Sequence, residues 1–509
     1  MRLLALVLIS FTALAAQEVG LDTWRTSGLG VDWHHASGRV AYDVKGDDGY
    51  YDIRLADPDG GNDRPLSELA PGLPRRHVAT PGWHPSGRWL VAAVEEQDHA
   101  GGSYEAIPGF GAFNDIWAIA GDGSWAKRLT SIPDDIARGM IIPTFSADGR
   151  RLVWTERLIG PIWWDPKKQM GVWRVRVADV IEDAAGPRLT NIRSYQPGGE
   201  GFHEPYAFTP NGRGIIMATS IGQPSVWTLQ IVVMDLASGQ ITQRLTQTNY
   251  NEHARFTPDG RSIVWMTNAS STLGGCDWWM MDADGANKRR LSYFNEPGHP
   301  HCDGHARWAG LMTFAPDGRS FLGGGQYDLF SQEGWIKRVT LLPNGTGTGL
   351  TGEYFAREDL RGADGGLEAD LERLDATVDF NWGWWMPAFG LPADRFSVRW
   401  SGELEPAYSG VYTFHLTADD GARLWIDDRL VVDMWGGAWG GVASGTAPLV
   451  AGRRHAIRLE YRESWGAAVM KLEWSGARQV RQVIPTSRLH PREPAGAVRR
   501  LFGLPGGNG

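Results

Sequence analysis

The sequence predicts an all-β protein, a six-bladed β-propeller followed by a C-terminal β-sandwich. Two short motifs that recur through the first two-thirds of the chain predict the propeller. A change after Leu341 to alternating apolar and polar residues, broken by Gly and Asp turns, predicts the sandwich. The chain of 509 residues has room for several domains of roughly 150 residues each.

The first recurring motif is a turn in which an aromatic residue or His precedes a short polar stretch and Gly-Arg. Its copies are His35–Arg39, Trp83–Arg88, Phe145–Arg150, Phe208–Arg213, Phe256–Arg261 and Phe314–Arg319. Pro presets φ, Asp or Asn starts the turn, and Gly accepts the positive φ of a tight hairpin. The apolar runs that follow, such as Ser262–Met266, are predicted strands.

The second motif closes each unit with Ser or Thr after an apolar residue. Its copies are Leu66–Ser67, Arg128–Thr130, Arg188–Thr190, Arg244–Thr246, Arg290–Ser292 and Arg338–Thr340. The turn glycines at positions 38, 87, 149, 212, 260 and 318 are 48 to 63 residues apart, which is room for four short strands. Such a sheet cannot bury both faces alone, so six of them are expected to stack as blades around a channel over residues 22–341.

These motifs together resemble the TolB-like (PD40) propeller repeat. The turn Phe-x-Pro-Asp-Gly-Arg and the element Asp-x-Asp-Gly-x-Asn before Arg-Leu-Thr or Arg-Leu-Ser carry the resemblance. It implies a periplasmic or exported scaffold that binds proteins or ligands at its ends, and it does not fix a function.

The last third of the chain has a different pattern. Residues 342–349 are Gly-rich and are expected to form a linker. An antiparallel β-sandwich is predicted over residues 350–491, with a flexible tail at 492–509. Its characteristic segments are Leu350–Phe355, Phe396–Gly402, Ser409–Phe414, Ala418–Asp428 and Leu459–Tyr461. These segments, in this order, resemble a PA14 domain over about residues 347–491.

The resemblance to PA14 domains implies a calcium site at Asp419 and Asp420, because several members bind glycans through a calcium ion held by an Asp pair. Ca²⁺ takes six to eight oxygen ligands, and adjacent carboxylates on a tight loop supply several of them. The same residues followed by Gly421 also make a good structural turn. Both interpretations remain open. Asp433 is a further candidate ligand, whereas the Asn-bearing second loop of sugar-binding members is not identifiable in this sequence.

Tryptophan is abundant, with 25 Trp against 17 Phe and 13 Tyr. Most of these residues fall in predicted strands, where they are expected to pack between blades. Trp435 and Trp439 lie in a Gly-rich loop and are candidates either for stacking on a pyranose or for anchoring that loop. The stretch Trp382–Trp385 leaves a similar choice between sugar stacking and packing against the propeller.

The N-terminal residues 1–16 are expected to be a secretory signal peptide. Arg2 is followed by the apolar run Leu3–Leu14 and by small residues at Ala13 and Ala15. No later apolar stretch reaches the length of a transmembrane helix. The protein is therefore expected to be exported to the periplasm or the extracellular space. Cys276 and Cys302 are the only cysteines, and in an exported protein a disulfide is favoured slightly over two free thiols.

Composition and motifs exclude several classes of function. The net charge is 50 − 59 = −9 and no long basic run is present, which argues against nucleic acid as a partner. No Gly-x-Ser-x-Gly elbow and no P-loop lysine occur, so a propeller-associated serine hydrolase and a P-loop nucleotidase are not expected.

One cluster of ionisable residues precedes the first strands of the fourth, fifth and sixth blades. First strands of a propeller line its channel, so these side chains are candidates to converge there and to hold a transition metal such as Mn²⁺, Zn²⁺ or Fe²⁺. The alternative is a channel that is polar because water fills it. The candidate residues are Glu200, His203, Glu204, Glu252, His253 and His305.

Three functions are compatible with these observations. The first is an exported, non-catalytic protein whose PA14 module recognises extracellular or cell-surface carbohydrate, with calcium at Asp419 and Asp420. The second is a metal-dependent polysaccharide lyase or hydrolase that uses the channel cluster. The third is an envelope scaffold that binds other proteins.

Overall fold

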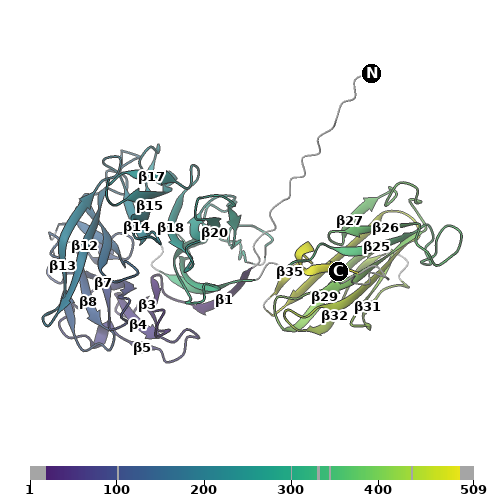
Figure 1. Ribbon diagram of the computed structural model, residues 1–509, viewed down its shortest axis with the longest axis horizontal. Coiled ribbons are helices and arrows are strands. Elements are labelled where there is room, and N and C mark those ends of the chain that lie inside the picture. Colours follow the sequence, from purple (N-terminus) through teal and green to yellow (C-terminus); the bar gives the residue numbers. More distant parts are fainter. Residues whose placement is uncertain are drawn as a thin grey trace, which may run out of the picture. The chain divides into compact units, whose positions relative to one another are not determined.

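The computed structural model describes residues 19–99, 102–133, 135–299, 301–328, 333–342, 345–436, 440–477 and 479–492. Contacts between residues divide the chain into two compact units, Met1–Leu342 and Pro343–Gly509 (Figure 1). The expected signal peptide lies outside the described residues, as does the expected tail beyond residue 492. Within the described ranges, no helix has the length and apolar character needed to span a membrane.

The first unit consists of four-stranded antiparallel sheets, six of them in the described residues. The first three are β2 (Val31–Trp33), β3 (Val40–Lys45), β4 (Tyr51–Ala56) and β5 (Arg64–Pro65); β6 (Val78–Trp83), β7 (Trp89–Glu95), β8 (Asn114–Ala120) and β9 (Ala126–Arg128); and β10 (Gly139–Phe145), β11 (Arg151–Ile159), β12 (Val172–Asp183) and β13 (Gly186–Tyr195). The other three are β14 (His203–Phe208), β15 (Gly214–Thr219), β16 (Gln230–Asp235) and β17 (Ile241–Arg244); β18 (Asn251–Phe256), β19 (Ser262–Thr267), β20 (Asp277–Asp282) and β21 (Arg289–Arg290); and β22 (Trp308–Phe314), β23 (Ser320–Gln326), β24 (Gly334–Leu341) and β1 (Val19–Arg25).

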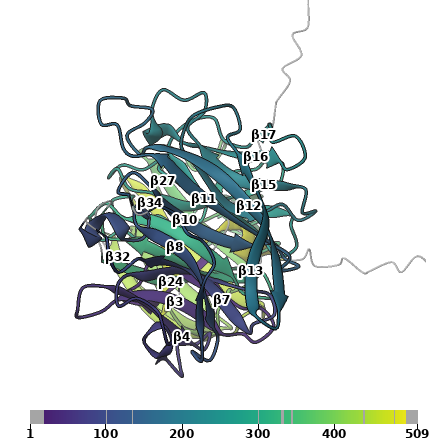
Figure 2. The same cartoon turned by 90° about the vertical axis from the view of Figure 1, so that its left-hand side faces the viewer.

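The sheets form a closed series. The first strand of each sheet contacts the first strand of the next, and β2 of the first sheet contacts β22 of the last. The N-terminal strand β1 pairs with β24, so one sheet contains both ends of the propeller sequence. In Figure 2 the first strand of the third sheet, β10, lies beside β7 and β8 of the preceding sheet. This arrangement is the predicted six-bladed propeller, in which β1 completes the last blade and not the first.

The turn motif has the expected structural role in all six blades, and the closing motif has it in all but the last, where β1 closes the sheet. All six turn glycines, from Gly38 (φ 74°) to Gly318 (φ 66°), have positive φ. In four blades the Ser or Thr of the closing motif holds the third strand, whereas Arg338–Thr340 lies within β24, the third strand of the last blade. The hydroxyl oxygen of Ser292 accepts from the N–H of Trp278 at 3.0 Å and donates to Asp277 at 2.7 Å. The hydroxyls of Ser67, Thr130 and Thr246 accept equivalent N–H groups in three other blades.

Large aromatic side chains fill the spaces inside and between the blades. The indoles of Trp89, Trp154, Trp173, Trp265 and Trp278 are almost completely buried. Trp278 makes edge-to-face contacts with Phe294, Phe321 and Trp335. The propeller therefore uses much of the tryptophan excess for packing, as the sequence predicts.

The second unit is a sandwich of two antiparallel sheets around one apolar core. One sheet has the order β26-β25-β28-β33-β30-β31, with β36 also on β28; the other has the order β27-β34-β29-β32, with β35 also on β34. The strands are β25 (Leu350–Phe355), β26 (Leu371–Asp375), β27 (Asp379–Gly383), β28 (Phe396–Leu404), β29 (Gly410–Asp419), β30 (Gly421–Ile426), β31 (Arg429–Asp433), β32 (Gly441–Leu449), β33 (His455–Glu463), β34 (Ala468–Gly476), β35 (Gln479–Val483) and β36 (Leu489–Pro491). Trp400 and Trp474 are fully buried between the sheets.

Part of the expected linker belongs to the sandwich. The N–H of Gly347 donates to the carbonyl of Ser487 at 2.8 Å, and that of Gly349 donates to Leu489 at 3.0 Å. A Cβ atom on Gly347 would lie 2.2 Å from the Leu489 carbonyl oxygen, so the close approach requires glycine there. The Gly-rich composition reflects packing at this point. The helical elements of the described residues are 3₁₀ turns: η1 (Ser67–Leu69), η2 (Ser103–Ala106), η3 (Val226–Thr228) and η4 (Thr486–Arg488).

Candidate functional site

One repeat position carries two carboxylates toward a cavity of the propeller. It lies four residues before the aromatic residue that ends the first strand of each blade. In chain order its occupants are Leu29, Ala79, Ile141, Glu204, Glu252 and Gly310. Glu204 and Glu252, from the adjacent blades that begin with β14 and β18, line a cavity of about 130 Å³. The closed series of blades thus places two glutamates side by side where the other blades have apolar residues or glycine.

The residue that follows Glu252 is turned into the same cavity by a bulge in β18. The pairing between β18 and β19 shifts register between Glu252 and Arg255, and His253 has a φ of 56°. Thr80 and Ile142 occupy the corresponding position in two other blades, also with positive φ, and they line the same cavity. A bulge re-aims a side chain in this way.

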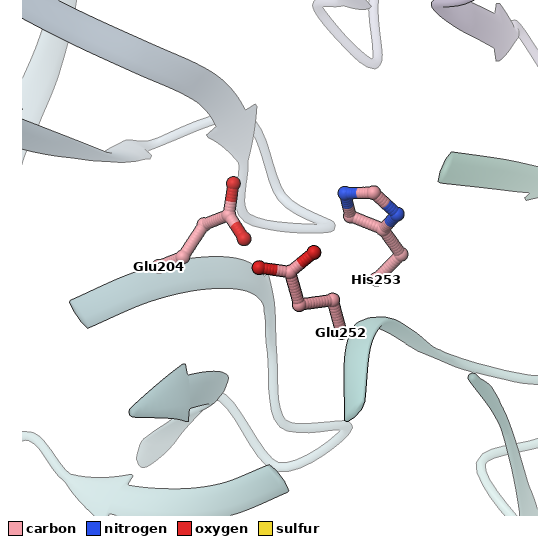
Figure 3. A group of neighbouring side chains, drawn as sticks. All are labelled: Glu204, Glu252 and His253. Atoms are coloured by element: carbon pink, nitrogen blue, oxygen red, sulfur yellow. The ribbon is translucent and has the colours of Figure 1, made fainter. Parts of the chain in front are cut away.

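The three side chains form a compact group. One ligand atom each from Glu204, Glu252 and His253 lies within 4.8 Å of the others (Figure 3). Glu204 is 4% exposed and Glu252 is 7% exposed. Figure 3 shows both carboxylates and the imidazole turned toward a shared space. In the described part of the chain, this group alone brings three His, Cys, Asp or Glu side chains so close together.

A buried tyrosine lies beside each carboxylate. The Tyr206 hydroxyl donates to Glu204 at 2.5 Å. The Tyr250 hydroxyl favours the charged form of Glu252. Burial raises the pKa of Glu204 to about 7, and the bond from Tyr206 opposes the rise. Burial and the nearby charge of Glu204 raise the pKa of Glu252 well above its usual range. Neither carboxylate forms an ion pair with a Lys, Arg or His among the described residues.

His253 is neutral at physiological pH. Burial, reinforced by the charge of Arg255, lowers the pKa of His253 to about 3. Its Nδ1 is buried and has no hydrogen-bond partner among the described residues. A neutral imidazole with a free ring nitrogen is the form that binds metal ions.

The other channel candidates lie elsewhere. His203 is fully buried and both of its ring nitrogens are satisfied, by the Gly199 carbonyl and the Thr219 hydroxyl, each at 3.0 Å. The His305 side chain is 75% exposed and lies beside Asp303. Glu200 is exposed and pairs with Lys168 at 2.9 Å. The structure therefore reduces the candidate cluster to Glu204, Glu252 and His253, because the other three side chains do not point into the cavity.

The disulfide favoured by the sequence is not formed, and both cysteines are free thiols. Cys276 is fully buried in the propeller core, and its N–H donates to the carbonyl of Arg307 at 2.9 Å. Cys302 lies in the turn after His299, where its sulfur accepts from the N–H of Gly304 at 3.4 Å. Hydrogen bonds to their own neighbours thus hold Cys276 in the propeller core and Cys302 in a turn.

The Asp pair of the sandwich lies between β29 and β30. Its peptide bond is cis. The Asp420 carboxylate is only 6% exposed and accepts from the N–H of Ser464 at 2.7 Å. The Asp419 carbonyl accepts a hydrogen bond from the Tyr461 hydroxyl. These bonds tie the pair to β33 and to the loop that follows it.

Two further acidic residues, Glu463 and Asp394, lie near the Asp pair and belong to no sequence motif. Burial raises the pKa of Glu463 to about 7, and Asp420, Asp419 and Asp394 add to the rise. Glu463 is fully buried, and its Oε1 has no hydrogen-bond partner among the described residues. A donor set made of oxygens with an orphaned buried carboxylate atom fits Ca²⁺ better than a soft metal. Among the described residues, no three side-chain ligand atoms at the Asp pair lie within 4.8 Å of one another, so a calcium ion would need further ligands.

The aromatic candidates near the pair differ in exposure. Trp435 is partly buried, and the guanidinium of Arg423 lies 4.2 Å from its ring centre, as expected for a loop anchor. Trp439 lies outside the described residues. Trp465, which was not among the sequence candidates, is 69% exposed, and its N–H lies 3.4 Å from Asp420 Oδ2. Only the fold places Trp465 beside the Asp pair, because Trp465 lies 45 positions after Asp420 in the sequence.

The second aromatic stretch is also divided. Trp382 stacks on Phe380 with ring centres 4.8 Å apart and packs against the sandwich core. Trp384 and Trp385 are each 77% exposed. Asp433 is exposed, and its carboxylate accepts from the N–H of Trp435 at 3.0 Å, which is a local turn contact.

Comparison with known proteins bears on the two units separately. The PA14 domain family model matches residues 347–488. Anti-sigma-I factor RsgI3 of Acetivibrio thermocellus is 39% identical over 150 residues, which is 30% of this chain and 22% of that protein. The chain thus spans less than a quarter of this curated relative.

Solved structures are similar to each unit. TolB from Acinetobacter baumannii is 16% identical, with 60% of this chain and 64% of that chain covered and a TM-score of 0.40. A PA14 sugar-binding domain from an RTX adhesin is 20% identical, with 28% of this chain and 99% of that chain covered and a TM-score of 0.25. The strand order of the first unit is that of a propeller, and residues 347–488 of this chain form a PA14 domain.

Proposed function

We propose that this protein is exported and recognises carbohydrate through its PA14 domain, with a calcium ion at Asp419 and Asp420. One observation carries the proposal. A nearly buried Asp420 carboxylate acts electrostatically on Glu463, whose Oε1 has no partner among the described residues, and it lies beside the backbone N–H of the exposed Trp465. Because the PA14 family includes carbohydrate-binding modules, this combination supports a sugar site more than a plain turn.

Each residue has a defined part in the proposed site. Asp419 and Asp420 would hold the ion, and calcium when bound supplies positions for sugar hydroxyls. The N–H groups of Ser464 and Trp465 orient the Asp420 carboxylate. The Trp465 indole offers a flat apolar surface on which a pyranose ring can stack. The exposed edge of the sandwich at this loop is where an extracellular glycan would bind.

Glycan-array binding of the full chain, with calcium and after EDTA treatment, tests the proposal. Binding is expected in calcium, and Asp420→Asn should reduce it at least tenfold because one charged ligand is lost. Asp433→Asn is the matched control, since Asn Oδ1 can still accept from the Trp435 N–H. The proposal is wrong if no glycan binds in calcium, or if both variants bind as well as the wild type.

The lyase or hydrolase alternative has weaker support. Glu204 and Glu252 do converge on a cavity with His253. A polymer, however, must reach the reacting groups, and carboxylates that are 4% and 7% exposed are shielded from a polysaccharide chain. The propeller cavity therefore favours a small ligand over cleavage of a polymer.

A further inference from the structure

We propose that Glu204, Glu252 and His253 bind one divalent transition-metal ion, such as Zn²⁺ or Mn²⁺, inside the propeller cavity. This site is independent of the Asp pair and of carbohydrate recognition. The geometry is suitable, because Zn²⁺ holds nitrogen and oxygen ligands at about 2.0–2.2 Å, so that two ligands of one ion lie up to about 4.4 Å apart. The three ligand atoms already lie within 4.8 Å of one another.

The chemistry of the group favours a metal ion. Two buried carboxylates lie together, and among the described residues neither forms an ion pair with a Lys or Arg, which is costly unless a cation or a shared proton compensates. The imidazole of His253, which faces the two carboxylates in Figure 3, distinguishes the site from a simple acid pair. A mixed set of one imidazole and two carboxylates selects transition metals over Ca²⁺.

The surroundings supply the outer contacts that a metal site needs. The Tyr206 hydroxyl donates to Glu204 and fixes the orientation of that carboxylate. The bulge at His253 sets the direction of the imidazole. The rest of the wall is mainly apolar, with Leu29, Ile142 and Met266 among its residues.

Three protein ligands leave at least one coordination position open. The cavity of about 130 Å³ has room beside the ion for several water molecules or for a small ligand with an oxygen donor. A carboxylate or hydroxyl compound of a few atoms is the class that fits. An ion with an open position in a largely apolar pocket is typical of metal sites that bind exchangeable ligands.

Titration of the EDTA-treated full chain with Co²⁺, in excess calcium to saturate oxygen-only sites, tests the proposal. Visible absorption reports Co²⁺ with a nitrogen ligand in a low-coordination site. One Co²⁺ per chain is expected, displaced by Zn²⁺, and either ion should raise the melting temperature of the propeller by mass action.

Variants separate this site from adventitious binding. Glu252→Gln keeps the shape and should weaken Co²⁺ binding at least 100-fold. His253→Asn, which tolerates the positive φ, should do the same. Tyr206→Phe should weaken binding about tenfold through loss of an outer contact. His305→Ala, at an exposed histidine, and Asp420→Asn, in the sandwich, are the controls and should bind Co²⁺ as the wild type does.

Circular dichroism and tryptophan fluorescence establish that each variant is folded. The Tyr206→Phe variant retains all three ligands, so it remains informative if Glu252→Gln does not fold. Two results would overturn the proposal. One is a wild-type chain that takes up no Co²⁺ or Zn²⁺, which would leave a shared proton as the link between the glutamates. The other is a loss of binding in His305→Ala equal to that in His253→Asn.

Discussion

The propeller cavity and the Asp pair of the sandwich both gather acidic side chains, but they do so by different means. Glu204 and Glu252 are 48 residues apart and meet because the same repeat position of adjacent blades faces one channel. Asp419 and Asp420 are neighbours in the chain at a strand junction. The propeller group is enclosed, whereas the Asp pair adjoins an exposed Trp465. The first arrangement suits a small ion and ligand, and the second suits a large external ligand.

The largest expected effect comes from tryptophans that serve only packing. Trp278→Ala should destabilise the propeller by about 3–5 kcal/mol, because it removes a buried indole and its contacts with three aromatic rings. Trp384→Ala, at an indole that is 77% exposed, should change stability by less than about 0.5 kcal/mol. Calorimetry of the full chain measures both, and equal effects would contradict this division of the tryptophans.

A second prediction concerns the cost of the enclosed carboxylates. Without metal, Glu252→Gln should stabilise the propeller by about 1–2 kcal/mol, because a buried carboxyl next to another carboxylate becomes a neutral amide. With Zn²⁺ the order should reverse, since only the wild type gains binding energy. Thermal unfolding with EDTA and with Zn²⁺ measures the reversal. A variant that is less stable than the wild type under both conditions argues against the idea that the site sacrifices stability for binding.

A third prediction separates the two indoles near the Asp pair. Trp465→Ala should weaken glycan binding by about 1 kcal/mol, roughly fivefold, through loss of a stacking surface. The melting temperature of the sandwich should stay nearly unchanged, because most of the side chain is exposed. Trp435→Ala should instead lower stability, since Arg423 packs on that indole. Calorimetry and glycan titration of the two variants measure this contrast, which is lost if Trp435→Ala alone impairs binding.

The smallest expected effect concerns His77, a buried structural histidine of the propeller. His77 accepts a hydrogen bond from the N–H of Tyr51 at 3.0 Å, and burial lowers its pKa. The folded pKa lies below the unfolded value of about 6.5, so the unfolded chain binds the extra proton and stability falls as pH drops below 6.5. His77→Asn should reduce this slope by less than about 1.4 kcal/mol per pH unit. Melting temperatures of the wild type and the variant between about pH 5 and about pH 7 measure this slope. Parallel curves for the two proteins would refute the prediction.

Much of the fold could be predicted because its signals are local. The turn glycines all have positive φ, and in four blades the closing Ser or Thr bonds the backbone of the third strand. Each of these features acts within one blade and repeats, so short motifs reveal them. The role of β1 could not be predicted, because its pairing with β24 connects residues more than 300 positions apart.

The candidate sites were predictable only in part. Residue types identified Glu204, Glu252 and His253, and also His203 and His305, which take no part in the group. His203 is held by Gly199 and Thr219, and no sequence pattern distinguishes it from His253. Glu463 and Trp465 belong to no sequence motif. The one weak signal is that both residues closely follow the predicted strand segment Leu459–Tyr461.

The sequence by itself determined the all-β class, the number of blades, the PA14 domain and the position of the Asp pair. These follow from hydrogen-bonding and turn preferences that act over a few residues. The tertiary structure decided which ionisable groups meet, which indoles remain exposed and whether the cysteines bond. Closure of the blades brings Glu204 and Glu252 together, and the β18 bulge turns His253 toward them. Sheet packing decides which indoles are exposed and keeps the two cysteines unbonded. Side-chain direction and burial depend on register and long-range packing, which no short stretch of sequence contains.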